Sequence, residues 1–290
     1  MAFRTVVINN HSKIEYSLNY LVFRTAEETK RILLDEIHTV IVQSTQVNVS
    51  SALLVELAKR KIKVVFCDEK NNPFVETVSL YGDSISPRRI KQQINWDESF
   101  CHQLWALIVK EKIYQQSLIM RYKNFDQITI QLQEYIDEVV DDDQTNREGH
   151  AAKVYFNNLF DKNFTRDKDC FENASLNYGY SIIMSQISRE IVAQGYLTQL
   201  GIHHKNEFNH FNLSCDLMEP FRPIVDKMTL ILKDDEDFKK AMVKLLNIKV
   251  FIDGIETSLE NAIHIYVLSI FNSIENKDLS KVRFFSGYEL

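Results

Sequence analysis

The chain has 290 residues, of which 45% are hydrophobic and 26% charged, and carries a formal net charge of −6 at pH 7. This composition provides for a sizeable core in one large domain or two smaller ones, and the negative charge argues mildly against a generic nucleic-acid binder. The longest apolar run, about residues 262–271, is too short to span a bilayer. The N-terminus has no apolar secretory segment, so a cytoplasmic protein with no membrane contact is expected.

The four cysteines and the distribution of charge narrow the function further. No two cysteines are spaced as a C-x-x-C zinc or redox pair, so reduced, mostly core-filling thiols are expected. The stretch 147–227 has nine basic and ten acidic residues. The excess negative charge therefore lies mainly outside this central stretch.

Residues 1–80 predict a β-rich, β-sandwich-like domain. Short segments rich in β-branched and aromatic residues indicate strands, and a segment with helical spacing follows Ser50, a good N-cap residue. The expected strands are 4–8, 13–18, 20–23, 39–42, 62–66 and 74–80, and the expected helix is 50–59. Gly, Asp, Ser and Pro gather at 81–87, which places a linker at 81–95.

From Pro87 onward, apolar residues recur at intervals of three and four, which predicts helices. The expected helices are 96–122, 125–140, 151–160, 178–200, 223–232, 238–246 and 259–274. Residues 96–290 are therefore expected to form a larger all-α domain, and the fold class is α+β. The apolar tail at 283–288 is expected to dock onto the protein.

Three polar clusters lie between helical segments. The first, at 145–150, contains Glu148. With Thr145 it matches a capping box, in which both residues serve the start of a helix. Alternatively, the spacing 4, 3, 4 places Glu148 on one face with Ala152, Tyr155 and Leu159. If that face is buried, the carboxylate needs a partner or a metal.

The second cluster contains His203 and His204, in a polar loop after Gly201, which is expected to end the preceding helix. Two exposed loop histidines are the structural alternative to a ligand. Neighbouring histidines point in different directions, so at most one is an obvious ligand, and His210 is a rival.

The third cluster, at 216–223, places Asp216 and Glu219 three residues apart, on one face of a helix. The structural alternative is that both acids complement a helix N-terminus, with Glu219 paired to Arg222. Two carboxylates held together need a shared cation or proton. Oxygen ligands with one imidazole suit Mg²⁺ or Mn²⁺.

With these clusters, essentially the whole chain resembles the CRISPR adaptation integrases, the universal subunits that insert spacers into CRISPR arrays, in their type II-A form. The matching motifs are Asn146-Arg147-Glu148-Gly149-His150, Gly201-Ile202-x-His204-x-Asn206, and Asp216-Leu217-Met218-Glu219-Pro220-Phe221-Arg222-Pro223. The resemblance implies metal ligation by Glu148, by His204 rather than His203, and by Glu219, where many relatives carry Asp. It leaves Asp216 as a further ligand or as a residue behind the ligands.

The same resemblance implies an enzyme that joins prespacer 3′-hydroxyl ends to the CRISPR repeat by transesterification. It implies double-stranded DNA as partner (prespacer and leader–repeat), with Arg147, Lys205 and Arg222 as candidates to hold phosphates. It also implies a homodimer through the N-terminal domain, a heterohexamer with a dimer of a companion adaptation subunit, and a type II-A effector nuclease and ring-forming accessory protein. Two other readings stay open: a non-catalytic DNA-binding scaffold, and a metal-dependent nuclease that uses water.

Overall fold

The computed structural model describes residues 4–69, 73–77, 86–162, 164–232 and 238–288. The chain divides into two compact units, Met1–Ser84 and Ile85–Leu290. Of the expected linker at 81–95, residues 81–85 lie outside the described residues. Helix α2 (Ser86–Ile94) occupies most of the remainder, with the helical character expected from Pro87 onward.

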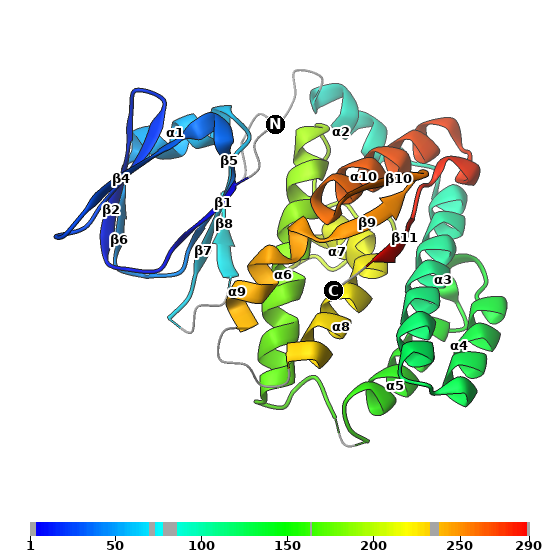
Figure 1. Ribbon diagram of the computed structural model, residues 1–290. Helices are drawn as coiled ribbons and strands as arrows, with labels where there is room; N and C mark the ends of the chain where they lie inside the picture. The colour runs from blue at the N-terminus through cyan, green and yellow to red at the C-terminus, as the bar shows by residue number, and fades with distance from the viewer. Residues whose placement is uncertain (1–3, 70–72, 78–85, 163, 233–237, 289–290) are drawn as a thin grey trace. The chain divides into compact units, whose positions relative to one another are not determined.

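The first unit contains two four-stranded sheets (Figure 1). One has the order β1-β5-β7-β8, in which β1, β5 and β7 are parallel and β8 is antiparallel to β7. Its strands are β1 (Arg4–Ile8), β5 (Ile37–Val42), β7 (Lys63–Cys67) and β8 (Pro73–Glu76). Every residue of β5 is buried, as expected for a central strand covered on both faces.

The other sheet has the order β4-β3-β2-β6. Strands β2, β3 and β4 are antiparallel neighbours, and β6 runs parallel to β2. The strands are β2 (Ser12–Ser17), β3 (Tyr20–Arg24), β4 (Thr29–Leu33) and β6 (Val47–Val49). Helix α1 (Ser51–Lys59) contacts strands of both sheets, and the 3-10 helix η1 (Leu34–Glu36) precedes β5. The β-rich N-terminal region is confirmed, although β4 and β6 were not expected.

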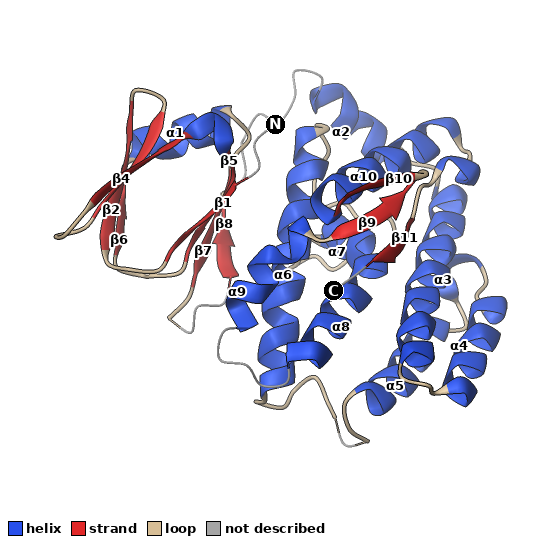
Figure 2. Cartoon of the chain, in the orientation of Figure 1, coloured by secondary structure: helices blue, strands red, loops and turns tan. Residues whose placement is uncertain are grey.

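The second unit is mostly helical (Figure 2). Two long helices organise it: α3 contacts α4, α5, α7 and α8, and α6 contacts α7, α8, α9 and α10. The α-helices after α2 are α3 (Glu98–Tyr122), α4 (Asp126–Glu138), α5 (Arg147–Leu159), α6 (Phe171–Ala193), α7 (Asn212–Met218), α8 (Arg222–Leu232), α9 (Phe238–Lys244) and α10 (Leu259–Asn276). The 3-10 helices are η2 (Asp141–Asp143), η3 (Glu219–Phe221), η4 (Leu245–Asn247) and η5 (Leu279–Lys281).

The expectation of an all-α second domain is wrong, because this unit contains a three-stranded antiparallel sheet. Its order is β10-β9-β11, from Ile255–Ser258, Lys249–Ile252 and Phe285–Tyr288. Asp253 (φ 51°) and Gly254 (φ 75°) form the turn between β9 and β10, and this pair of positive φ angles suits an Asp-Gly hairpin. The apolar tail docks as strand β11, with Phe285 buried against Phe221 at 5.1 Å between ring centroids.

Helix α6 ends earlier than expected. The sequence predicts a helix to residue 200 that is ended by Gly201, but α6 stops at Ala193. Gly195, with φ 81°, follows it, and a positive φ is typical of the residue that terminates a helix. The chain from 194 to 211 is consequently a loop, and His203 and His204 lie in its middle.

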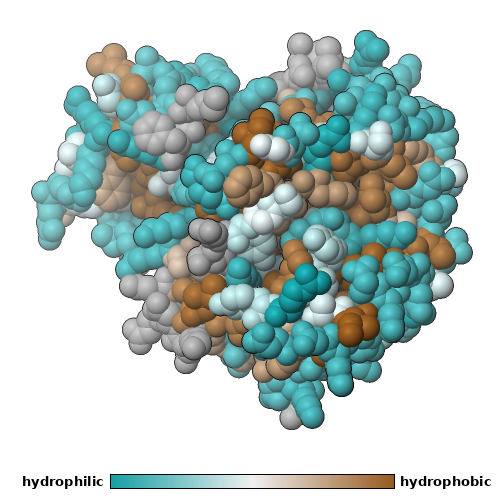
Figure 3. Space-filling view, turned by 45° about the vertical axis from the view of Figure 1, so that its right-hand side comes forward, coloured by the Kyte–Doolittle hydropathy of each residue, from teal (hydrophilic) through white to brown (hydrophobic). Residues whose placement is uncertain are grey.

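Hydrophilic side chains make up most of the surface seen in Figure 3. Within the described part of the chain, none of the helices combines the length and apolar character that a membrane crossing requires.

Candidate active site

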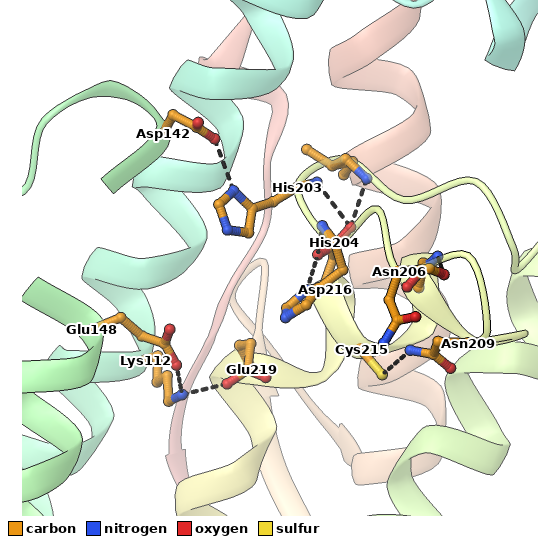
Figure 4. A network of polar contacts seen from close by, with 12 residues as sticks. Lys112, Asp142, Glu148, His203, His204, Asn206, Asn209, Cys215, Asp216 and Glu219 are labelled. Atoms are coloured by element: carbon orange, nitrogen blue, oxygen red, sulfur yellow. Dashed lines mark hydrogen bonds and ion pairs between the residues drawn. The ribbon is translucent and has the colours of Figure 1, made fainter. Parts of the chain in front are cut away.

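The start of helix α5 directs Glu148 toward the interior of the second unit. Asn146 caps this helix by accepting a hydrogen bond from the Gly149 amide at 3.2 Å. The Asp143 carboxylate accepts bonds from the amides of Arg147 and Glu148, both at 2.9 Å. The capping-box alternative is therefore wrong, because other residues bond the exposed amides, and the Glu148 side chain forms an ion pair with Lys112 of α3 (Figure 4).

Lys112 joins two of the expected site acids. Its ammonium forms ion pairs with Glu148 Oε1 and, at 2.5 Å, with Glu219 Oε2. Its side chain is only 8% exposed. Lys112 is not among the site residues predicted from the sequence, although a signal exists. Leu104, Ile108 and Lys112 are spaced by four, so the lysine continues a buried apolar stripe of α3.

Glu219, the first residue of η3, is buried between two cations. Arg222 Nε donates to Glu219 Oε1 at 2.8 Å, and Lys112 lies on the other oxygen. Burial alone would raise the pKa of Glu219, but the charges of Arg222 and Lys112 outweigh it and hold the pKa at about 2. The Glu219–Arg222 ion pair, which was part of the structural alternative to a metal ligand, is present, and it orients a carboxylate that stays ionised.

Asp216 is the residue that fixes the histidine loop. Its side chain is fully buried. One oxygen accepts bonds from the amides of Ile202 and His203, at 2.5 and 3.1 Å. The other accepts from the His204 amide at 3.1 Å and contacts His204 Nδ1 at 2.5 Å. Asp216 thus lies behind the histidine, holding the ring by Nδ1 and leaving Nε2 for another partner.

Gly201 makes this close packing sterically feasible. A Cβ at Gly201 would lie 2.4 Å from the His204 carbonyl oxygen and 2.7 Å from Asp216 Oδ2. The expectation that Gly201 ends a helix is therefore wrong. This glycine instead lets the loop fold tightly over the Asp216 carboxylate.

His203 and His204 have different surroundings. The His203 ring stacks on Trp105, with centroids 4.3 Å apart and an interplanar angle of 3°, and its Nδ1 lies 2.8 Å from Asp142 Oδ1. The hydrogen bond to Asp216 raises the pKa of His204, against the effect of burial and with help from the charges of Glu219 and Glu148. The charges of both acids therefore act on His204, whereas His203 is held by aromatic packing, and His210 is exposed.

The arrangement in Figure 4 brings the expected ligands Glu148, His204 and Glu219 around one region, with Lys112 between the two acids. Among the described residues, no group of three or more His, Cys, Asp or Glu side chains is placed to hold a metal ion. The donor set nevertheless fits a hard divalent ion, because the two carboxylates already share the Lys112 ammonium and an imidazole lies in the same region.

The expected phosphate-holding residues have acidic partners. Lys205 is 67% exposed and lies 2.9 Å from Glu98, whereas Arg147 pairs with Glu138 at 2.8 Å. Arg222 is committed to Glu219 and lies over the Tyr180 ring, 4.7 Å from its centroid. A cavity of about 650 Å³ borders His204 and Lys205 and is lined by the amides of Gln199, Asn206, Asn209 and Asn212 among others. Lys205 is thus the expected basic residue most open to an incoming phosphate.

The resemblance to the CRISPR adaptation integrases implies a β-rich unit followed by a helical catalytic unit. The structure has this organisation, and its helical unit carries the two acids and the carboxylate-bound histidine. The family model for the CRISPR associated protein Cas1 matches residues 5–253. The match covers most of the sequence, so the chain belongs to the Cas1 family. It is an enzyme, an endonuclease and integrase of CRISPR spacer acquisition.

Individual relatives agree with this assignment. The chain is 28% identical over 291 residues to the CRISPR-associated endonuclease Cas1 of Neisseria meningitidis serogroup C (strain 8013), covering 98% of this chain and 96% of that protein. A Cas1 protein from Thermotoga maritima has a similar fold (TM-score 0.76, 15% identity, 99% and 100% of the two chains).

Two further structures share the fold. One is a casposase bound to its integration product (TM-score 0.79, 18% identity, 96% of this chain and 92% of that chain). The other is a Cas6-RT-Cas1–Cas2 complex (TM-score 0.74, 18% identity, 96% of this chain and 36% of that chain).

Proposed function

We propose that this Cas1 enzyme joins prespacer 3′-hydroxyl ends to the CRISPR repeat by metal-dependent transesterification at Glu148, His204 and Glu219. The observation that carries the proposal is the shared cation: two carboxylates from different helices converge on the Lys112 ammonium, and a histidine oriented by a buried aspartate lies in the same region. Such a converging set is costly unless it binds a cation.

Glu148, Glu219 and His204 Nε2 would hold Mg²⁺ or Mn²⁺. The positive charge of the ion would stabilise the negative charge that develops at phosphorus in the transition state. Asp216 is a positioning residue, because its bond to Nδ1 keeps Nε2 directed outward. This assigns the two acids of the third cluster separate roles: Glu219 holds the ion and Asp216 holds the histidine.

Arg222 acts on Glu219 rather than on DNA in this proposal, since its guanidinium is occupied by the Glu219 carboxylate and the Tyr180 ring. Lys205 and Arg147 would bind phosphates after exchanging their partners Glu98 and Glu138, both of which are exposed. Contacts of this kind weaken as salt concentration rises.

We assign the chain to the type II-A branch on its motifs, with a companion adaptation subunit, a type II-A effector nuclease and a ring-forming accessory protein as partners in the cytoplasm. The first unit would provide the homodimer contact. Support for the companion subunit comes from the shared fold with the Cas1 part of a Cas1–Cas2 complex, and support for DNA as substrate comes from the shared fold with the casposase and its integration product.

The test is product analysis on end-labelled branched DNA, with Mn²⁺ or with EDTA. The wild-type chain should give joined strands and the reverse disintegration products only with the ion. Glu148→Ala and His204→Ala should abolish both while folding and dimerisation persist. A scaffold would show no ion dependence, and a nuclease that uses water would give hydrolysed ends; either result contradicts the proposal. Full activity in either variant would refute the ligand assignment.

A further inference from the structure

Lys112 contacts both proposed ligand acids, but the proposed chemistry gives it no role. It lies in the middle of α3, where five of the eight helix residues within four positions of it are buried: Ile108, Val109, Ile113, Gln115 and Gln116. Its ammonium cannot be solvated there, since the side chain is 8% exposed. Burying a charge is costly unless it is paired. Glu148 and Glu219 therefore stabilise the buried ammonium of Lys112, and Lys112 in turn stabilises their two carboxylates close together.

The charges at the centre balance without any added ion. Glu219 contacts both Arg222 and Lys112, and Glu148 contacts Lys112. Two negative charges therefore face two positive charges. A divalent cation between the same carboxylate oxygens would meet the ammonium at short range, and like charges repel strongly where water is excluded.

We propose that Lys112 is a positioning residue that acts as an internal counter-ion: it holds Glu148 and Glu219 together in the ion-free enzyme and must leave their oxygens when a divalent ion binds. This rests on the proposed metal site. Since the displaced ammonium needs another anion, a DNA phosphate is its natural partner, and the ion and DNA should bind better together than separately. Lys112 thereby limits occupancy of the centre by divalent ions when no DNA is present.

The test is Mn²⁺ binding by the full-length chain without DNA, measured by calorimetry. Lys112→Met removes the competing charge and keeps much of the side-chain volume. The variant should bind Mn²⁺ about tenfold or more tighter than wild type, within the usual range of coupling between two ligands. The matched control is Lys123→Met. Lys123 follows the end of α3 and also links it to α5, but it does so through the carbonyls of Asn158 and Leu159. Its loss should leave Mn²⁺ affinity unchanged.

A second readout covers the case in which the variant folds poorly. Ion-free Lys112→Met should unfold at a lower temperature than wild type, and Mn²⁺ should restore it, because the two carboxylates then share the ion. Adding Glu148→Gln to the variant should remove that restoration. Unchanged or weaker Mn²⁺ binding, or a variant that stays unfolded with Mn²⁺, overturns the role of Lys112. Failure of the metal site itself looks different: wild-type strand transfer would then proceed in EDTA.

Discussion

Replacing Glu219 by glutamine tests whether the centre is held together by charge. The substitution preserves shape but leaves Arg222 and Lys112 with one acid, Glu148, between them. The pKa of Glu219 falls from its usual 4.5 to about 2 in the folded protein, which corresponds to about 3 kcal/mol in favour of the ionised form. Measured costs of breaking buried ion pairs by removing one partner are also about 3–5 kcal/mol. We therefore expect Glu219→Gln to lower the free energy of unfolding at pH 7 by about 3 kcal/mol.

The assay is urea or thermal unfolding of the ion-free protein. For a unit of this size, about 3 kcal/mol corresponds to a decrease in melting temperature of roughly 10 °C. The control is Glu148→Gln, because Glu148 is 32% exposed. When Glu148 is neutralised, Lys112 still has its ion pair with Glu219. This variant should lose only about 1 kcal/mol. The effect has a defined pH dependence: the folded-state pKa is depressed, so the stability is present above about pH 4.5 and is lost as pH falls toward 2.

Equal stabilities of Glu219→Gln and wild type at pH 7 would refute the reasoning. Such a result would mean that the two cations find adequate partners without this carboxylate. A decrease that persists unchanged at pH 3 would also contradict it, since the ion pair would then not be the source of the stability.

Three further predictions concern neighbouring residues. Asp216→Asn should reduce strand transfer by about 10- to 100-fold, and should also shift the acidic limb of its pH profile to lower pH, because Asp216 raises the pKa of His204; an unshifted profile would contradict the positioning role. His203→Ala should be much milder than His204→Ala in the same assay, and equal losses would show that the wrong histidine was chosen. Burial raises the pKa of Asp226 to about 6, so stability from its protonated form is present below its usual 3.8 and is lost as pH rises through 6. Asp226→Asn should accordingly flatten the dependence of melting temperature on pH between about 4 and 6, and an unchanged slope would show that other groups cause that dependence.

Periodicity predicted most elements of the fold because burial follows sequence spacing. The stripe that contains Leu104 and Ile108 predicted α3, and the β-branched run at 39–42 predicted most of the fully buried strand β5. One element that was not predicted depends on contacts between distant segments. Strand β11 forms only by pairing with β9, and its local sequence shows only an apolar tail. The β9–β10 hairpin, by contrast, has a local signal in the Asp253-Gly254 pair.

The sequence predicted which residue types form the candidate site. It did not predict which of these side chains contact one another. Spacing on α5 correctly placed Tyr155 and Leu159 on a buried face below Glu148. The division of roles that we propose for Asp216 and Glu219 could not be read from an interval of three residues. It follows from burial of Asp216 under the loop amides and from the approach of Lys112, more than one hundred residues earlier in the chain, to Glu219.

The contact between Trp105 and the two histidines has a practical consequence. Trp105 is buried, stacks on His203 and meets the edge of His204 at 5.6 Å. The other of the two tryptophans, Trp96, packs instead on Tyr196 and Phe271. Because a neighbouring imidazole quenches indole emission most strongly when protonated, the fluorescence of Trp105 should report the state of the histidine loop. Replacing Trp96 by phenylalanine would leave a single emitter beside the site, so that ion and DNA arrival could be followed in real time without any attached dye.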